Sequence, residues 1–222
     1  MHVLSVPCVV MASINFYVAA YYLFLYFKRP QTREHLPFAL LCLSVGLYDI
    51  FCVGLYNSLS VDEGVFWQRL QLDVVSFISI FLIWFAFFFT GQKNNRIVKI
   101  LIGWFAIILA VSLFINPDFS LSAAKPAVKY INLMNILKIT YYEGEVGAIY
   151  LIGLLSGVLV YIYFIYLFIQ YYKKTKRRVL IPFIISQFAY FFALINDTLV
   201  SMRVYPFIYV GEYAFLDRKS VV

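Results

Sequence analysis

The chain has 222 residues, of which 64% are hydrophobic and only 13% are charged, and its formal net charge is +7. Soluble domains carry about 25% charged residues, so this composition excludes an ordinary soluble protein and indicates a membrane protein. The basic excess does not indicate a nucleic-acid partner, because the lysines and arginines stand in short clusters between apolar runs and leave no exposed basic domain.

Long apolar runs follow one another along the chain, and a helix that crosses a bilayer needs about 20 mostly apolar residues. The expected spans are 5–27, 36–58, 66–90, 97–115, 146–172, 179–201 and 204–216. The sequence thus predicts an all-α membrane protein in which residues 1–222 form one seven-helix transmembrane domain. The seventh span is short, so it is either truncated, tilted into a protein-lined site or completed by residues beyond Val222.

The connections between these spans alternate in charge. One set, which includes the C-terminal residues, holds 13 lysines and arginines, whereas the other set holds four. Since basic connections stay in the cytoplasm, the N-terminus is expected outside the cell and the C-terminus inside.

Only one connection is long, and this orientation places it outside the membrane. Pro117 and Pro126 keep the first part of residues 116–145 non-helical. Residues 129–145 alternate in part between polar and apolar side chains, as strands do. We therefore expect either a small β-hairpin over the mouth of the bundle or a short interfacial helix.

Six charged side chains lie inside the apolar runs or at their mouths, all in the outer half of the membrane. They are Asp49, Arg69, Asp73, Asp197, Arg203 and Glu212. Charge in hydrocarbon is costly, so it usually faces the bundle interior and marks function. Arg69 and Asp73, four residues apart, share a helix face and can form an ion pair.

The sixth span adds further polar groups to the same depth. Tyr190 and Asp197 fall on one side of this helix, and the amide of Asn196 can both donate and accept hydrogen bonds. The sequence therefore predicts an outward-facing polar cup. Such groups can also simply join helices, but four acids against two arginines favour a binding site, because unpaired carboxylates need water, a cation, a proton or a ligand.

Motifs of enzymes and cofactor sites are missing from the sequence. It has no phosphate loop and no nucleophile elbow, its two histidines lie at the terminus or in a loop, and its three cysteines lack metal-ligand spacing. We therefore expect no catalytic residues, no cofactor and no metal.

Three short motifs resemble one family. Phe66-Trp67-Gln68-Arg69-Leu70-Gln71 at the start of the third span, Asn196-Asp197 in the sixth and Tyr205-Pro206 after it are similar to the N-terminal seven-transmembrane sensor region of bacterial histidine kinases. Similar regions also precede diguanylate cyclase domains. The resemblance implies roles for Trp67 and Arg69 at the mouth and for Asn196 and Asp197 in the core. It also implies the bacterial inner membrane, and a catalytic region after the seventh helix that residues 1–222 do not include.

We expect a sensor that binds a small extracellular ligand in the cup and signals to a cytoplasmic output domain within a homodimer. Arg69 would hold an anionic ligand group or position Asp73, and the other acids would supply acceptors. The candidate ligand-binding residues are Asp49, Trp67, Arg69, Asp73, Tyr190, Asn196, Asp197, Arg203 and Glu212. The alternatives are a small-molecule or proton-coupled transporter and a membrane-embedded enzyme that uses two aspartates.

Overall fold

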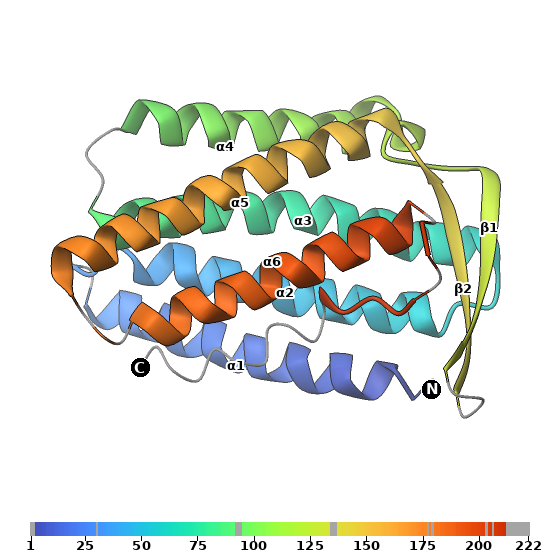
Figure 1. The fold of residues 1–222 in the computed structure, drawn as a ribbon, viewed down its shortest axis with the longest axis horizontal. Coiled ribbons are helices and arrows are strands. Elements are labelled where there is room, and N and C mark those ends of the chain that lie inside the picture. Colours follow the sequence, from blue (N-terminus) through green and yellow to red (C-terminus); the bar gives the residue numbers. More distant parts are fainter. Residues whose placement is uncertain are drawn as a thin grey trace.

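The computed structural model describes residues 3–29, 31–91, 95–133, 137–176, 178, 180–202, 204–205 and 207–211. These residues form a bundle of long helices covered at one end by a two-stranded sheet (Figure 1). The helices are α1 (Ser5–Lys28), α2 (His35–Tyr56), α3 (Val61–Thr90), α4 (Asn95–Ala110), α5 (Ala148–Thr175) and α6 (Leu180–Ser201). A π-helical turn, η1 (Val111–Ile115), continues α4, and a 3₁₀ turn, η2 (Pro117–Phe119), follows it.

The first six predicted spans are helices in the structure, with boundaries close to those expected. Five helices of the described chain are long and apolar enough to cross a membrane: α1, α2, α3, α5 and the combined α4–η1 segment. Their outer faces carry large apolar side chains that water would not tolerate; Phe27, Ile100 and Leu159, for example, are 78%, 70% and 70% exposed. Lipid is the natural cover for such a surface.

Helix α3 begins at Val61, before the predicted start at Phe66. Ser60 caps the helix, since its hydroxyl accepts a hydrogen bond from the Glu63 amide at 3.3 Å. The Glu63 carboxylate in turn accepts one from the Leu59 amide at 3.0 Å. This polar capping signal lies outside the apolar run and extends the helix by more than a turn.

The seventh predicted span differs from the structure. Residues 204–205 and 207–211 are described, and none of them is α-helical, while residues 212–216 lie outside the described part of the chain. Side chains of α6 occupy the backbone groups that a helix would use: Asp197 accepts from the amides of Val210 and Gly211, and Asn196 donates to the Ile208 carbonyl. The expectation of a helix that starts near Val204 is therefore wrong for these residues.

The long connection contains the expected β-hairpin and not an interfacial helix. Strands β1 (Leu121–Leu133) and β2 (Leu137–Val146) pair antiparallel. The register shifts between Ser122 and Ala127, around Pro126, which has no backbone N–H to donate. The hairpin lies across one end of the bundle, and the α1–α2, α3–α4 and α5–α6 connections lie at the other (Figure 1). The three basic connections thus share one end, as the predicted topology requires.

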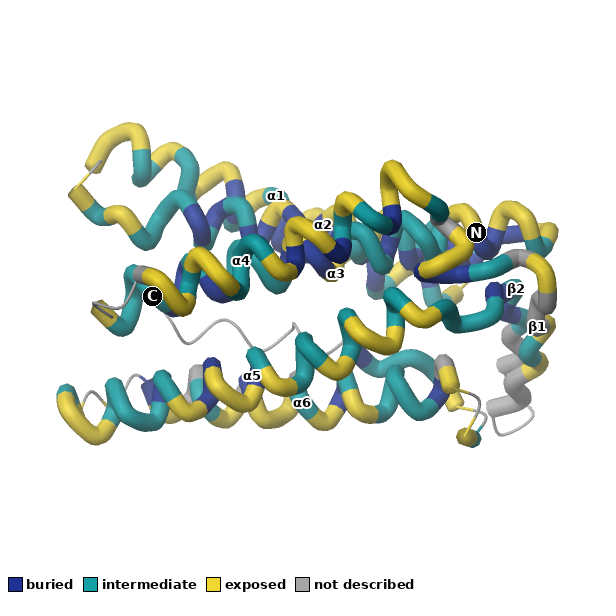
Figure 2. Tube along the Cα trace, turned by 90° about the horizontal axis from the view of Figure 1, so that it is seen from above, coloured by how far each residue is buried: buried dark blue, intermediate teal, exposed yellow. Residues whose placement is uncertain are grey.

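Close packing is concentrated in α1, α2 and α3. Met11, Leu41, Val45, Val74 and Ile78 form a buried cluster that joins these three helices. In Figure 2 the buried segments gather where α2 and α3 meet, whereas α5 and α6 are mostly exposed or intermediate. Helix α5 reaches the rest of the bundle mainly through α3 and α6.

Candidate functional site: a cavity beneath the hairpin

A cavity of about 230 Å³ lies between α3, α5 and α6, beneath the base of the hairpin. Its walls are mostly apolar, but several polar side chains from different elements reach it. The polar lining residues at the hairpin end are Gln68, Gln71, Asp73, Ser112, Ser120, Tyr150, Asp197, Thr198 and Tyr209. Asp73 and Asp197, which the sequence placed on different helices at the same depth, thus face one cavity.

Asp73 is held in the cavity wall by the end of the fourth span. Its Oδ1 accepts a hydrogen bond from the Ser112 hydroxyl at 2.7 Å, and that hydroxyl lies 3.1 Å from the Ser120 hydroxyl. Ser112 belongs to the π-helical turn η1, a distortion that is frequent at functional sites. The three side chains join α3, η1 and the start of the hairpin around one carboxylate.

Arg69 does not form the expected ion pair with Asp73. Its guanidinium pairs with Asp118 and donates from Nε and Nη2 to the Leu121 carbonyl at 3.0 and 2.8 Å. The hairpin base therefore takes the hydrogen bonds that the sequence assigned to the neighbouring turn of α3. Arg69 anchors the hairpin to α3 and is not among the described residues that line the cavity.

Asp197 connects the cavity to the segment that follows α6. Its carboxylate accepts hydrogen bonds from the amides of Val210 at 2.6 Å and Gly211 at 2.8 Å, and from the Asn196 side chain at 2.9 Å. Tyr205 donates to the Asn196 amide oxygen. A Cβ atom at position 211 would lie 2.4 Å from the Asp197 carboxylate, so this approach requires glycine.

A buried ion pair between the hairpin and the bundle was not predicted. Lys129 Nζ lies 2.5 Å from Glu143 Oε2 and also donates to the Val200 carbonyl at the end of α6. Tyr209 donates to Glu143 Oε1 at 2.6 Å. Glu143 is only 2% exposed. The alternation of β2 places Tyr141 and Glu143 on one face, so strand periodicity was the available signal.

Tyr141 is the apolar part of the same hairpin contact. It is fully buried among Cys8, Cys52 and Tyr56, and its ring meets that of Tyr209 edge to face at a centroid distance of 5.7 Å. Burial, together with the nearby negative charge of Glu143, raises the pKa of Tyr141 well above its ordinary value. The hairpin thus inserts a neutral aromatic side chain into the mouth of the bundle.

The family model described as the N-terminal 7TM region of histidine kinase matches residues 7–216. The chain belongs to this family. The resemblance carried by the third-span and sixth-span motifs is therefore confirmed, and the chain is a sensory region of a membrane protein. No curated protein and no solved structure matches the chain.

The remaining predicted residues of this 7TM region lie away from the cavity or outside the described residues. Asp49 is fully buried between α1 and α2, where it accepts from the Asn15 amide at 3.2 Å. The Trp67 ring packs on Phe51 and lies directly against Gly54 of α2. Neither side chain is among the described lining residues, and both join helices. The Tyr190 side chain, Arg203 and Glu212 lie outside the part of the chain that is described.

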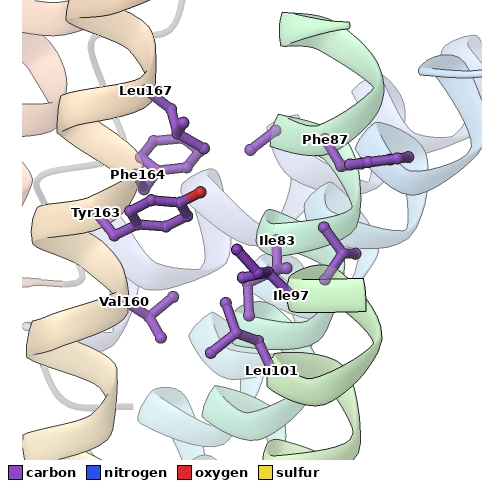
Figure 3. A pocket seen from close by; sticks show the side chains of 10 residues that line it. Ile83, Phe87, Ile97, Leu101, Val160, Tyr163, Phe164 and Leu167 are labelled. Carbon is purple, nitrogen blue, oxygen red and sulfur yellow. The ribbon is translucent and has the colours of Figure 1, made fainter. Parts of the chain in front are cut away.

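A second hollow in the 7TM region lies between α3, α4 and α5, toward the end opposite the hairpin. It measures only about 30 Å³ and is lined by side chains such as Ile83, Leu101 and Val160 (Figure 3). None of its described lining residues is charged, and a volume of this size holds about one water molecule. The cavity beneath the hairpin is therefore the candidate site.

Proposed function

We propose that this 7TM region binds a small extracellular ligand in the cavity beneath the hairpin and signals to a cytoplasmic output domain, a histidine kinase or a diguanylate cyclase. The observation that carries the proposal is the double contact of Asp197. This side chain lines the cavity and also holds the Val210 and Gly211 amides of the segment after α6. A change at the cavity wall therefore reaches the chain that leaves the bundle.

The mechanism follows from competition for one carboxylate. A ligand group that donates to Asp197 weakens its bonds to Val210 and Gly211, and a group that fills the cavity pushes α5 and α6 apart and shifts Asp197 relative to these two amides. Binding shifts an equilibrium between two arrangements only by the difference in affinity for them. The segment 207–211 supplies those two arrangements, held to α6 or released from it.

The location follows from charge and family. The basic connections would face the cytoplasm and the hairpin the outside of the cell, in the bacterial inner membrane. The output domains of a homodimer would lie at the basic end. A ligand from outside would reach the cavity past the hairpin. Arg69 of α3 holds the base of this hairpin, because it pairs with Asp118 and donates to the Leu121 carbonyl.

The distribution of polar groups favours a sensor over a transporter. The cavity's lining residues reach Leu82 on α3 and Tyr161 on α5, and both helices continue well beyond these positions toward the basic connections. Transport needs a polar route through the inner half of the membrane. Among the described lining residues, those at the inner end of the cavity, such as Leu82, Phe105 and Val158, are mostly apolar.

The test replaces a ligand by a side chain that fills the cavity. Gly157 lines the cavity, and a Cβ atom there meets no atom of the described residues within 4 Å. Gly157→Leu in nanodiscs should change hydrogen–deuterium exchange of the peptide covering residues 207–211 by at least threefold. Exchange is the right measurement because it reports the bonds to Asp197 directly.

Gly103→Leu is the matched control, since its Cβ also meets open space but Gly103 does not line the cavity. It should leave the exchange of residues 207–211 unchanged. Equal exchange in the wild type and both variants would show that the cavity does not communicate with this segment, and it would overturn the proposal.

A further inference from the structure

We propose that the cavity selects an amphiphile, a molecule with one linear apolar chain and a head that donates hydrogen bonds, such as a primary amine or an alcohol. This inference rests on the proposed function, because it names the ligand class of the same site. It follows from the shape of the cavity, from the acids at one end and from the apolar walls at the other.

The cavity is elongated along the helix axes. Its lining residues on α3 run from Gln68 to Leu82, which corresponds to about 21 Å at the helical rise of ~1.5 Å per residue. On α5 they run from Ile149 to Tyr161, or about 18 Å by the same rise. A volume of about 230 Å³ with walls of that length is a narrow channel and not a round chamber. Its shape fits a chain better than a ring or a compact polar solute.

The hairpin end of the channel accepts hydrogen bonds and carries negative charge. Asp73 and Asp197 line it, and no lysine or arginine is among the described lining residues. Ionised carboxylates only accept hydrogen bonds. Asp73 uses Oδ1 for the Ser112 hydroxyl, and no described residue donates to its Oδ2. This end therefore favours a donor or a cation and disfavours a carboxylate or phosphate head.

The inner end of the channel is apolar. Ile78, Leu82, Phe105 and Val158 line it. Two polar groups at this depth already donate within the protein: Ser79 to the Val75 carbonyl, and Tyr161 to the carbonyl and side chain of Gln187. A ligand tail beside these two side chains gains burial without meeting a hydroxyl proton that needs an acceptor.

Glycine keeps this inner end open. Gly153 and Gly157 of α5 both line the channel one turn apart. A Cβ atom at position 157 would meet nothing within 4 Å, so the space beside it holds no atom of the described residues. Glycine in a helix costs about 1 kcal/mol relative to alanine, and a channel that must admit a chain explains why that cost is accepted here.

The test compares octylamine, 1-octanol and octanoate, which share one chain length and differ in the head. Binding is measured by calorimetry to the 222-residue chain in phosphatidylcholine nanodiscs, with empty nanodiscs subtracted. Octylamine should bind most tightly, octanol less tightly and octanoate at least tenfold more weakly than octylamine. Hexylamine should bind more weakly than octylamine by about fourfold per methylene group removed, the factor expected from burial of each CH₂.

Two pairs of variants locate the tail and the head. Gly157→Leu should weaken octylamine at least tenfold, while Gly103→Leu should leave it unchanged. Asp73→Asn keeps the shape of the side chain and removes the charge, so the preference for octylamine over octanol should fall below threefold while octanol still binds. Equal affinities in Gly157→Leu and wild type, or octanoate as tight as octylamine, would overturn the inference.

The source of the amphiphile is a further outcome. Addition of 10% phosphatidylethanolamine to the nanodisc should not compete with octylamine, because this lipid carries a phosphate and two chains; competition would overturn the single-chain amphiphile and favour a membrane lipid as the ligand. Binding of ethanolamine as tight as that of octylamine, unaffected by Gly157→Leu, would overturn the amphiphile and leave the sensor proposal standing. Tight octylamine binding with no change in exchange at residues 207–211 would overturn the sensor proposal alone.

Discussion

The α1–α3 half of the bundle and the half formed by α5, α6 and the hairpin use the same residue types in opposite ways. In the first half, glycines bring helices together: Cβ atoms at Gly46 and Gly54 would lie 2.7 Å from the Phe16 ring and 2.3 Å from the Trp67 ring. In the second half, Gly157 faces open space. Glycines of α2 thus close contacts between helices, whereas Gly157 of α5 leaves space beside the cavity.

The buried polar groups follow the same division. Asn15 donates to Asp49 and Asn57 donates to the Ser5 hydroxyl at 2.7 Å, so in the first half polar side chains join helices. Asp197 of α6, in the second half, instead lines the cavity, and Asp73 reaches the same cavity from the side of α3 that borders it. The difference indicates a fixed scaffold beside a part that can rearrange, which is what a sensor needs.

The largest effect is expected where the hairpin contacts the bundle through a buried ion pair. Lys129→Met leaves the nearly inaccessible Glu143 carboxylate without its cation, which should destabilise the docked hairpin by about 3–5 kcal/mol. Hydrogen–deuterium exchange of residues 137–146 should rise by more than a hundredfold. The α1–α3 half should keep the exchange of the wild type.

The double variant Lys129→Met/Glu143→Leu is the control for this effect. Replacement of both charges by apolar side chains removes the buried charge altogether and should restore most of the protection. A double variant as unprotected as the single one would show that Lys129 acts through its other contact, the Val200 carbonyl.

The next largest effect concerns the link between the cavity and the segment after α6. Asp197→Asn replaces a charged acceptor of three hydrogen bonds by a neutral one. Hydrogen bonds to charged groups contribute about 1.5–3 kcal/mol, so exchange of residues 207–211 should become at least tenfold faster. Asp62→Asn, at an exposed position in the first turn of α3, is the matched control and should change nothing in this segment.

Alanine at two glycines tests the contrast between the halves directly. Gly54→Ala forces a methyl group against the Trp67 ring and should cost about 1–3 kcal/mol of stability. Gly157→Ala adds the same group in open space and should be neutral, or stabilise by up to about 1 kcal/mol through helix propensity. Thermal unfolding of both variants in one nanodisc preparation measures the difference. Equal losses would mean that the two halves are packed alike.

The sequence predicts the helices well, because the length of apolar runs is a local property. The hairpin over 116–145 was also within reach, since the partial alternation favoured strands and the two prolines disfavoured a helix. The sequence placed Asp73 and Asp197 at a similar depth and so predicted that they share one site, where both line the cavity. It did not predict the hydrogen-bond partners of the two carboxylates.

The partners were missed because they depend on tertiary structure. Arg69 lies one turn from Asp73, yet the hairpin brings Asp118 and the Leu121 carbonyl to it from about 50 positions away along the chain. Asp197 similarly binds amides of a segment whose apolar composition predicted a helix. Helical spacing identifies residues that can pair, but it does not identify competitors from distant segments.

The smallest effect tests whether the hairpin docks by shape or by hydrogen bonding. The Tyr141 hydroxyl is buried and makes no hydrogen bond within the described residues. Tyr141→Phe should therefore leave stability at pH 7 unchanged or raise it by about 1 kcal/mol, because an unsatisfied polar group is removed. Tyr130→Phe, at an exposed position of β1, should have no effect and serves as the control.

The pH dependence of stability provides a second test of Tyr141, because the direction of the change can be predicted. Burial raises the pKa of Tyr141 in the folded protein, whereas an unfolded tyrosine titrates near pH ~10. Above that pH the unfolded chain releases the proton and the folded chain keeps it, so this residue lowers stability as pH rises beyond about 10. Thermal unfolding between pH 8 and 11 should therefore show a shallower fall for Tyr141→Phe than for the wild type or Tyr130→Phe. Parallel curves for all three proteins would mean that Tyr141 is exposed to water when the hairpin is docked, and the division between a closed mouth and an open cavity would be lost.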